Sequence, residues 1–471
     1  MKTTLVAAGT LAVLVACGGG GSSGSMSQTG AQSVATWGTI TAFGSVYVNG
    51  VRYDVSRATL KKNDTTVAQT GLAVGEVALV RGREDTQTGQ GEADSVDVED
   101  SVVGPITTIT GNQLTVLGQT ISVTTNTSFG PGITDLTALK VGDSIEVSGL
   151  PGMGGVIMAT RIGRAESTEP LQVLGTVGTV SATTLMINGL TVDFSTANVS
   201  GFASGKPATG NLVIARGTAF DGVTLTATAV RLADTDRDEQ AAGGLVEEEG
   251  LITSVTQTAS GMDLVVAGAK VTTTASTVFR NGTATDLAPN VRVEVRGTLD
   301  ANKVLVADVV EIEHIAVIAL AATVSGLNPL TVLGVTISVD ANTRFEDESN
   351  AHLQMFALTD VMMGDTVLVR GYEKPAGSGM VLATRLVRLP PLPSMDVAVR
   401  GPFTASTATQ FKILGITIDA TSAKLYGTGG QSLTTAEFFT QAVGQVVDVL
   451  GTASGSTVTA SKAIIDPLED R

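Results

Sequence analysis

Short runs in which apolar and polar residues alternate recur along the whole chain, and glycines separate them. In "QLTVLGQTISV", residues 113–123, Leu, Val and Ile alternate with Thr and Ser on both sides of Gly118. Such alternation is typical of strands with one buried face, and glycine supplies the backbone angles of a tight hairpin. No long segment shows a helical period of 3.6 residues. The pattern therefore predicts an all-β chain of many short strands.

This hairpin recurs six times. Residues 116–129 ("VLGQTISVTTNTSF") and residues 332–345 ("VLGVTISVDANTRF") are identical at ten of 14 positions. Weaker copies begin at residues 48, 187, 266 and 413. The glycines predicted to form the hairpin turns are Gly50, Gly118, Gly189, Gly268, Gly334 and Gly415. Internal repetition of this kind predicts a tandem array built from one supersecondary unit.

Three further marks keep the same order in each copy. A head glycine precedes the hairpin, at Gly38, Gly104, Gly175, Gly250 and Gly401, with Leu320 in the fifth copy. Two glycines seven residues apart follow it, at Gly75/Gly82, Gly142/Gly149, Gly210/Gly217, Gly364/Gly371 and Gly444/Gly451, and Asn290 stands before Gly297 in the fourth copy. An alanine comes last, at Ala93, Ala159, Ala227, Ala307, Ala383 and Ala460. The predicted order is strand, strand, turn, strand, variable segment, strand, turn, strand.

Five strands with a helical turn between the third and the fourth match the order of an OB-like barrel, and a small β-sandwich is the alternative. We therefore predict six small five-stranded OB-like barrels in tandem. The expected divisions are a signal peptide at 1–16, a tether at 17–36, and repeats 1 to 6 at 37–100, 101–169, 170–243, 244–316, 317–393 and 394–471. Units of this size bury a modest fraction of their surface, so neighbours are expected to pack in part. Short linkers predict an elongated array.

The N-terminus has the pattern of a secretory leader, with Lys2 followed by an apolar stretch that is too short to span a bilayer. "LVAC", residues 14–17, resembles the lipobox of bacterial lipoproteins. The resemblance implies cleavage before Cys17, a thioether-linked diacylglycerol on its sulfur, and acylation of the new amine, with palmitate as the expected chain. Gly18 is not acidic, which favours the outer membrane of a Gram-negative bacterium. The Gly/Ser-rich residues that follow predict a flexible tether.

The spacing of the glycines resembles the bacterial domain of unknown function family 5666, which occurs in tandem in lipoproteins. Residues 38–54, "GTITAFGSVYVNGVRYD", are expected to be the closest match, and the likeness extends over about residues 37–466. The resemblance implies the fold of that family and a location in the cell envelope. It implies no catalytic residue.

Charge and residue usage narrow the function. A net charge of −16 disfavours nucleic acid and anionic membrane surfaces as partners, because both are bound mainly through Lys and Arg. Cys17 is the only cysteine, so no internal disulfide forms. The two histidines, His314 and His352, are expected on the surface, and neither a catalytic triad nor a histidine zinc site is predicted. We expect no enzyme activity and no cofactor.

Two groups of residues are candidates for ligand binding. Trp37, Phe43, Tyr47 and Tyr53 fall within 17 residues, and such rings form stacking faces for carbohydrate; the alternative is a barrel core with one exposed ring. A second group, Asp234, Asp236 and Asp238, alternates as in calcium loops and predicts a weak divalent-cation site; the alternative is a solvated acidic linker.

A recurring "VRG" places an arginine before the second glycine of four copies, and these arginines are expected to pair with carboxylates at the strand edges. They are Arg81, Arg216, Arg296 and Arg370. The expected function is that of a non-catalytic, membrane-anchored lipoprotein acting as envelope spacer, adhesin or assembly scaffold. The alternative is a lipoprotein that binds carbohydrate or a divalent cation through the aromatic face or the acidic loops. A hydrolase is the least favoured reading.

Overall fold

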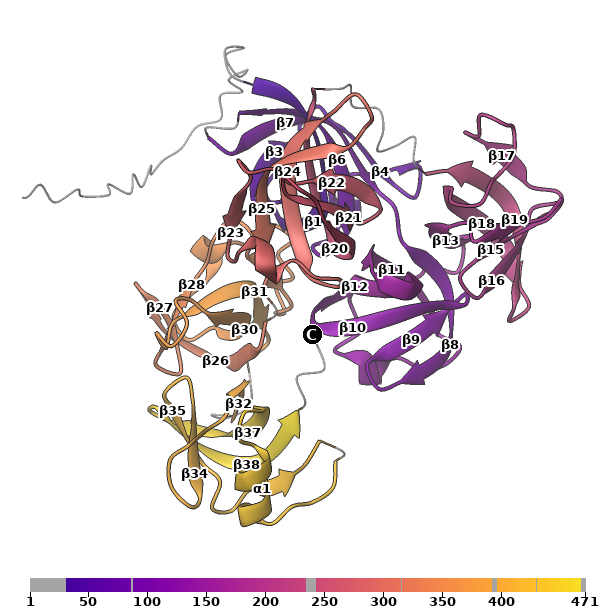
Figure 1. Cartoon of the computed structure of the whole chain (residues 1–471). Helices are drawn as coiled ribbons and strands as arrows, with labels where there is room; N and C mark the ends of the chain where they lie inside the picture. Colours follow the sequence, from indigo (N-terminus) through magenta and orange to yellow (C-terminus); the bar gives the residue numbers. More distant parts are fainter. Residues whose placement is uncertain are drawn as a thin grey trace, which may run out of the picture.

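The computed structural model describes residues 31–85, 88–233, 243–314, 316–391, 396–428 and 430–466. Within these ranges the protein is nearly all β, and each of the six repeats closes into a small barrel (Figure 1). The predicted all-β array of OB-like barrels is confirmed. None of the helices in the described part of the chain is long and apolar enough to cross a membrane.

The first three repeats contain the following elements. Repeat 1 has β1 (Ala31–Phe43), β2 (Val46–Val48), β3 (Val51–Asp54), β4 (Thr59–Lys62), β5 (Thr65–Thr66), η1 (Gln69–Gly71), β6 (Val77–Asp85) and β7 (Gln90–Val98). Repeat 2 has β8 (Val102–Thr110), β9 (Gln113–Val116), β10 (Gln119–Phe129), η2 (Leu136–Ala138), β11 (Ser144–Pro151), η3 (Met153–Gly155) and β12 (Ile157–Arg164). Repeat 3 has β13 (Leu171–Thr176), β14 (Thr179–Val180), β15 (Thr184–Ile187), β16 (Leu190–Asp193), β17 (Asn198–Ser200), β18 (Leu212–Phe220) and β19 (Thr224–Leu232).

The last three repeats follow the same plan. Repeat 4 has β20 (Leu245–Gln257), β21 (Met262–Val266), β22 (Ala269–Thr272), β23 (Val278–Arg280), η5 (Ala284–Asp286), β24 (Arg292–Leu299) and β25 (Leu305–Ile312). Repeat 5 has β26 (Ile318–Leu327), β27 (Leu330–Val332), β28 (Val335–Ser338), β29 (Arg344–Asp347), η6 (Leu358–Asp360), β30 (Thr366–Glu373) and β31 (Val381–Leu389). Repeat 6 has β32 (Asp396–Pro402), β33 (Thr404–Ala405), β34 (Gln410–Ile413), β35 (Ile416–Asp419), β36 (Lys424–Tyr426), α1 (Thr435–Gln441), β37 (Val446–Ser454) and β38 (Thr457–Asp466).

Repeat 2 shows how each barrel closes. Strand β8 pairs with β9, β9 with β10, β10 in parallel with β12, β12 with β11, and β11 again with β8. This circular order, first-second-third-fifth-fourth, is that of an OB-fold rather than a sandwich. The variable segment before the fourth strand contains a single helical turn in repeats 1, 2, 4 and 5 and the seven-residue helix α1 in repeat 6, as predicted.

The hairpin turns explain the recurring glycines. In five repeats both central residues of the turn have positive φ, which is the type I′ geometry that matches the twist of the strands. These pairs are Asn49-Gly50, Leu117-Gly118, Ala267-Gly268, Leu333-Gly334 and Leu414-Gly415. In repeat 3 only Asn188, at φ 50°, has a positive φ, and Gly189 does not.

Replacing Gly415 with alanine is expected to destabilise repeat 6 by about 1–2 kcal/mol, the cost of a Cβ in the left-handed region. Gly415 has a φ of 82°, and no atom lies within 4 Å of the Cβ position, so backbone conformation is the whole effect. Hydrogen exchange of the amides of β34 and β35 in the full-length chain measures it. Gly415→Asn is the control and should cost clearly less, because Asn tolerates positive φ; equal costs would contradict the reasoning.

The second glycine of each pair was predicted to lie in a turn, and this is wrong. It lies inside the fourth strand at a β-bulge, where the pairing with the fifth strand shifts register. A Cβ there would come within 2.0–2.6 Å of a carbonyl oxygen on the fifth strand. The recurring alanine is its cross-strand partner in all six repeats: Gly82/Ala93, Gly149/Ala159, Gly217/Ala227, Gly297/Ala307, Gly371/Ala383 and Gly451/Ala460. Both marks therefore belong to one bulge that bends the barrel wall.

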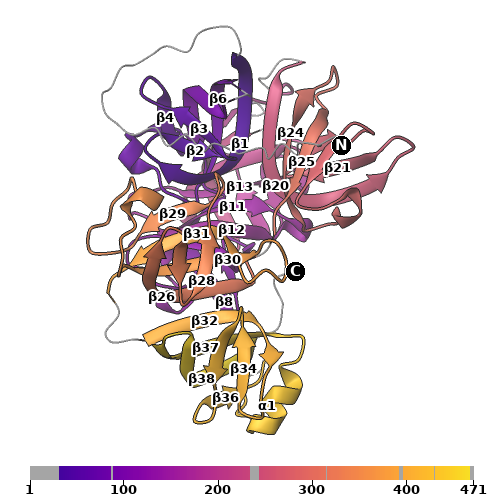
Figure 2. The ribbon, with the colours of Figure 1, turned by 90° about the vertical axis from the view of Figure 1, so that its left-hand side faces the viewer.

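The repeats are joined in pairs through their first strands. Strand β8 pairs antiparallel with β13, and β26 antiparallel with β32, so repeats 2 and 3, and repeats 5 and 6, share continuous sheets. Repeat 1 pairs with repeat 4, because β1 runs parallel to β20 (Figure 2). The order of the repeats in space therefore differs from their order in the chain. Sequence neighbours were expected to pack on each other, but repeat 1 pairs its first strand with that of repeat 4.

The first strand also begins earlier than expected. Residues 31–36, which were assigned to the tether, form the start of β1 and pair with both β6 and β20. Val34 is buried there in the core of repeat 1. Cys17 and the remainder of the predicted tether lie outside the described residues.

Candidate functional site

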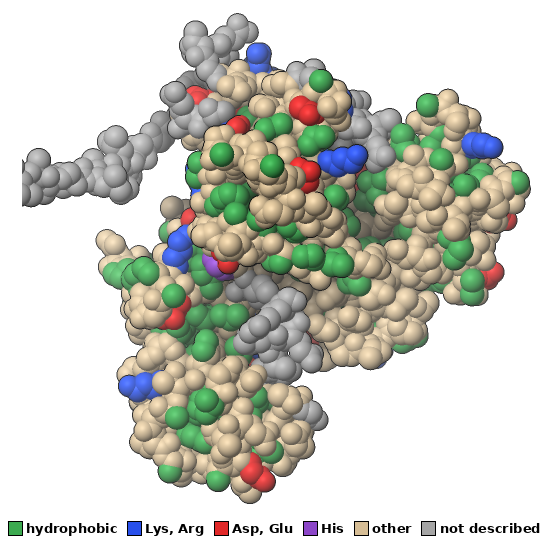
Figure 3. All heavy atoms as spheres, viewed as in Figure 1, with side chains coloured by type: hydrophobic (Ala, Val, Ile, Leu, Met, Phe, Trp, Pro, Cys, Tyr) green, Lys and Arg blue, Asp and Glu red, His purple; other side chains and the backbone are tan. Residues whose placement is uncertain are grey.

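Buried charges gather where repeats that are distant in the sequence meet. Strand β20 carries three successive glutamates, Glu247, Glu248 and Glu249, and all three are buried because β20 lies between β1 and β24. The face of the molecule in Figure 3, by contrast, shows only scattered charged side chains. A buried carboxylate needs a partner, so these residues mark the junction between repeats 1 and 4 as a polar part of the interior.

Glu249 and Arg292 form the centre of this junction. The guanidinium of Arg292 in β24 donates through Nε to Glu249 over 2.6 Å and lies 3.0 Å from the carboxylate of Glu313. Glu249 also accepts the backbone N–H of Thr39 in β1 over 2.6 Å. Burial raises the pKa of Glu249, but Arg292 and Arg344 outweigh it and hold the pKa below its usual range. The pair therefore stays ionised and ties β1 to β24.

A second network of polar contacts lies in the same junction between repeats 1 and 4. Arg296 of β24 lies 2.6 Å from Glu247 and 3.0 Å from Glu84 of β6, and the hydroxyl of Thr36 donates to Glu247 over 3.1 Å. Thr36 also lies 2.6 Å from the hydroxyl of Tyr53. Burial, helped by the charge of Glu84, raises the pKa of Glu247 to about 8. This carboxyl therefore takes up a proton at a higher pH than an exposed glutamate does.

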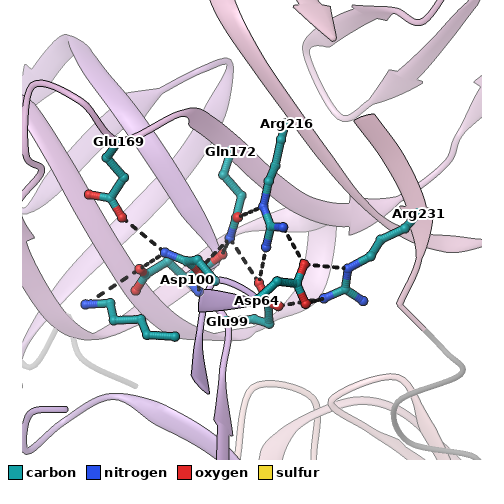
Figure 4. Close-up of polar contacts among 9 residues, drawn as sticks. Asp64, Glu99, Asp100, Glu169, Gln172, Arg216 and Arg231 are labelled. Atoms are coloured by element: carbon teal, nitrogen blue, oxygen red, sulfur yellow. Dashed lines mark hydrogen bonds and ion pairs between the residues drawn. The ribbon is translucent and has the colours of Figure 1, made fainter. Parts of the chain in front are cut away.

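Repeats 1, 2 and 3 meet in a third network (Figure 4). Arg216 and Arg231 of repeat 3 both bind Asp64 and Glu99 of repeat 1, with Arg216 2.9 Å and Arg231 2.5 Å from Glu99. The Nε of Arg216 donates to Gln172 over 2.6 Å. Repeats 1 and 3 are thereby fixed to each other, although no strand pairing joins them among the described residues.

The "VRG" arginines were expected to pair with carboxylates at strand edges. Three of the four form the following ion pairs. Arg81 lies 3.3 Å from Asp97, and Arg216 and Arg296 make the contacts described above. For two of these arginines the partner lies in another repeat, so the motif serves assembly as well as the individual barrel.

One group of carboxylates has the spacing of a metal site. Oxygen atoms of Asp100, Glu146 and Glu169 lie within 4.8 Å of one another. The ammonium of Lys62 already lies among them, 2.8 Å from Glu146, 2.7 Å from Glu76 and 3.8 Å from Asp100. Burial lowers the pKa of Lys62, but these carboxylates outweigh it and raise the pKa above its usual value. Lys62 supplies the positive charge, and the group is an ion-pair network that joins repeats 1 and 2.

Stability is expected to fall by up to about 7 kcal/mol between pH 5 and pH 9, at about 1.4 kcal/mol for each pH unit over which a carboxyl is protonated in the folded state and ionised in the unfolded state. Burial raises the pKa of Asp100 to about 7 and that of Glu247 to about 8. A carboxyl with a raised pKa stabilises the fold fully below its unfolded pKa and loses that contribution as pH rises through the folded pKa. Denaturant unfolding at a series of pH values measures this. Glu247→Gln should flatten the slope, and an unchanged slope in this variant would contradict the assignment.

A fourth junction joins repeats 2 and 5. The guanidinium of Arg385 in β31 binds Glu346 over 2.6 Å and donates to the carbonyl of Thr127 in β10 over 3.2 Å. The hydroxyl of Ser128 donates to Glu346 over 2.9 Å. Repeats 1, 2, 4 and 5 thus surround a common centre, while repeat 3 contacts repeats 1 and 2 and repeat 6 extends from repeat 5 (Figures 1 and 2).

The four aromatic residues do not form one exposed face. Tyr53 and Phe43 are buried in the core of repeat 1, Tyr47 is half-buried, and Trp37 packs with Val77, Leu150 and Leu251 between repeats 1, 2 and 4. The alternation that places Tyr53 inward is that of β3 itself, so its hydroxyl meets Thr36 instead of solvent. The structure therefore places these rings in packing roles.

The other predicted sites are placed as follows. Asp234, Asp236 and Asp238 lie outside the described residues, as does Cys17. His314 and His352 are exposed, as expected, and they lie in different repeats. The buried glutamates of β20 were not identified from the sequence. Their signal was available: three carboxylates stand between Val246 and Gly250, inside a run that otherwise reads as the first strand of a repeat.

No curated protein matches the chain. Among solved structures, the Drosophila protein "Unr CSD456" is 13% identical over 45% of this chain and 97% of its own, with a TM-score of 0.13. A multidomain protein with nucleic acid binding domains from Streptococcus pneumoniae is 12% identical over 45% of this chain and 71% of its own, with a TM-score of 0.12. Likenesses this weak carry no argument about function.

The family comparison is more informative. The model of a domain of unknown function, DUF5666, matches residues 103–163, 249–311 and 320–386, which correspond to repeats 2, 4 and 5. Residues 38–54, which were expected to match best, lie outside these three segments. All six repeats share one strand order and one bulge. The three matches, in repeats 2, 4 and 5, are consistent with tandem repeats of the DUF5666 domain.

Proposed function

We propose that the protein is a non-catalytic lipoprotein of a bacterial cell envelope and that it acts as a rigid scaffold. The observation that carries the scaffold role is the set of buried polar contacts between repeats, which includes the ion pair of Arg296 with Glu84 and the hydrogen bonds that Glu249 and Arg292 of repeat 4 make to Thr39 of repeat 1. Charges buried at junctions favour one arrangement of the barrels, because any other arrangement leaves them unpaired. A flexible string of beads needs no such junctions.

Scattering of the soluble fragment that begins after Cys17 tests the rigid arrangement. The curve is expected to fit six barrels in the arrangement of Figure 1, and Arg292→Met should increase the radius of gyration by opening the contact between repeats 1 and 4. A wild-type curve that requires independently moving barrels would contradict the scaffold role.

The envelope address is supported by the leader and the lipobox-like residues 14–17. Two or three acyl chains would hold the protein on a membrane, since one chain anchors only marginally. The absence of an acidic residue at Gly18 supports the outer membrane of a Gram-negative bacterium. The net charge of −16 supports partners other than nucleic acid, and a protein or carbohydrate of the envelope is the proposed class.

Cys17→Ser is expected to abolish membrane attachment. Cells fed an alkyne-labelled palmitate should label the wild-type chain and not the variant, and the variant should move from the detergent-soluble membrane fraction to the aqueous fraction. Thr10→Ser, inside the leader, is the control and should leave both readouts unchanged. Equal membrane recovery of Cys17→Ser and wild type would overturn the lipid anchor.

A pull-down from intact cells after cross-linking tests the partner. The acylated wild-type protein is expected to carry a cross-linked envelope component, and Arg292→Met should carry less of it, because a loosened scaffold no longer presents the same surface. A component recovered equally by both variants would show that single barrels bind it and that the rigid arrangement is not needed.

A further inference from the structure

The hairpin turns of repeats 2 and 3 pack directly against each other. Gly118 lies in the turn between β9 and β10, and its Cβ position is 3.0 Å from the carbonyl carbon of Gly189 in the turn between β15 and β16. The Cβ position of Gly189 is in turn 3.2 Å from the carbonyl oxygen of Gly118. The two backbones therefore meet with no side chain between them, and neither turn has room for additional atoms at this contact.

Two side-chain amides complete this contact. Gln119 is only 1% exposed, and its Nε2 donates to the carbonyl oxygens of Leu117 and Ile187, each over 3.1 Å. Its Oε1 accepts a hydrogen bond from Nδ2 of Asn188 over 2.7 Å. The same Nδ2 donates to the carbonyl oxygen of Gly155 over 3.3 Å. Gln119 cannot reverse its amide without leaving two carbonyl oxygens unpaired, so the group beside its Oε1 must be a donor.

Asn188 and Gly189 form an Asn-Gly pair at the outer end of this contact. Asn-Gly is the dipeptide most prone to spontaneous deamidation, because glycine has no side chain to hinder attack by its backbone nitrogen on the asparagine amide. Both residues are exposed to water, and among the described residues the backbone N–H of Gly189 donates no hydrogen bond. The two groups that react are therefore adjacent in the chain and open to solvent.

The deamidation needs water as its only co-reactant. The backbone nitrogen of Gly189 loses its proton and bonds to Cγ of Asn188, the bond from Cγ to Nδ2 breaks, and the side-chain nitrogen leaves as ammonia. Water then opens the cyclic imide at either carbonyl carbon. Opening at Cγ gives aspartate in place of Asn188. Opening at the backbone carbonyl gives isoaspartate, in which the main chain runs through the former side chain and is longer by one methylene.

Either product is incompatible with the contact between the two turns. A carboxylate in place of the Asn188 amide replaces a donor with an acceptor, directly beside Oε1 of Gln119 and the carbonyl oxygen of Gly155. Isoaspartate lengthens the turn where Gly118 leaves no room. We propose that Asn188-Gly189 is a deamidation site and that its conversion releases the hairpin of repeat 3 from repeat 2. The inference concerns the covalent chemistry of this turn and does not depend on the proposed scaffold role.

Peptide mapping by mass spectrometry of the folded full-length chain tests the reaction. The sequence contains three Asn-Gly pairs, so the other two serve as internal controls. Asn49 is only 9% exposed, and the side chain of Asn281 is held between Glu311 and Lys374. During incubation at pH 8, Asn188 is expected to convert at least threefold faster than either of them. Conversion of Asn188 no faster than that of Asn49 would overturn the proposal.

Two variants of the full-length chain test the release of the hairpin. Asn188→Asp reproduces the first product, and Asn188→Gly removes the amide without adding a carboxylate or straining the turn, since glycine tolerates the φ of 50° at this position. Hydrogen exchange of the amides of β15 and β16 at pH 7 should be at least threefold faster in Asn188→Asp than in Asn188→Gly. The difference should shrink at pH 4, because a protonated carboxyl can donate to Gln119 again.

The comparison of these variants can contradict the release in two ways. Equal exchange at pH 7 would show that a carboxylate is tolerated beside Gln119. A difference that is the same at pH 7 and pH 4 would assign the effect to the backbone of the turn and not to the lost donor. The pairing of β8 with β13 does not involve this turn, so both variants are expected to fold and to keep repeats 2 and 3 joined.

Discussion

Arg292→Met is expected to lower the free energy of unfolding by about 3–5 kcal/mol, because it removes the guanidinium that pairs with buried Glu249 and half-buried Glu313. Arg292 binds Glu249 and Glu313, and the side chain of Glu249 is only 3% exposed. The loss should appear as early opening of the contact between β1 and β20, which hydrogen exchange in the full-length chain detects as lost protection of the amides of Val34 and Ala35.

The matched control is an ion pair on the surface. Arg164 lies 3.2 Å from Asp143, and their side chains are 45% and 27% exposed. Arg164→Met should therefore cost no more than about 1 kcal/mol. If both substitutions cost the same, burial of the charges does not determine the strength of the junction. The double variant Arg292→Met with Glu249→Met should recover part of the loss, since it removes one of the stranded charges.

Gly217→Ala is expected to destabilise repeat 3 by about 3 kcal/mol or more, the upper range for overpacking, because the added atom meets backbone. Its Cβ would lie 2.2 Å from the carbonyl oxygen of Thr226 and 2.9 Å from a methyl group of Leu225. The bulge cannot relax without breaking the pairing of β18 with β19. Thermal unfolding of the full-length chain, followed together with exchange of the β18 amides, measures the effect.

Gly178 in the same repeat provides the comparison. It has no positive φ, and the nearest atom to its Cβ position is the carbonyl oxygen of Met186 at 3.7 Å, an ordinary contact. Gly178→Ala is therefore expected to change stability by less than about 1 kcal/mol. A loss at Gly178 as large as that at Gly217 would show that the bulge glycine is not required for steric reasons.

The barrel fold could be predicted because the sequence features that specify it are local. Alternation along a strand and glycine at a hairpin are readable within ten residues, as at Gly118, and the repetition multiplied the signal. The bulge glycines were mistaken for turns because a glycine needed for close approach looks the same in sequence as one needed for positive φ. A bulge glycine is distinguished by its partner on the neighbouring strand, which is the recurring alanine, as Ala227 is the partner of Gly217.

The junctions could not be predicted in the same way. Every repeat begins with a similar strand, so the pattern does not say which first strand pairs with which, and β1 pairs with β20 rather than with β8. The deciding residues are polar, such as Glu249 and Arg292, and polar residues in a strand are ordinarily assigned to solvent.

The parallel pairing of β1 with β20 has a consequence for how the chain assembles. Thr36 meets Glu247 across 211 positions of sequence, so the N-terminal barrel obtains its partner only after two other barrels have been made. Closing so long a loop is slow, and until it closes one edge of β1 is unpaired and can pair with the wrong strand. A chain that is synthesised N-terminus first therefore has its greatest need of a chaperone before repeat 4 is complete.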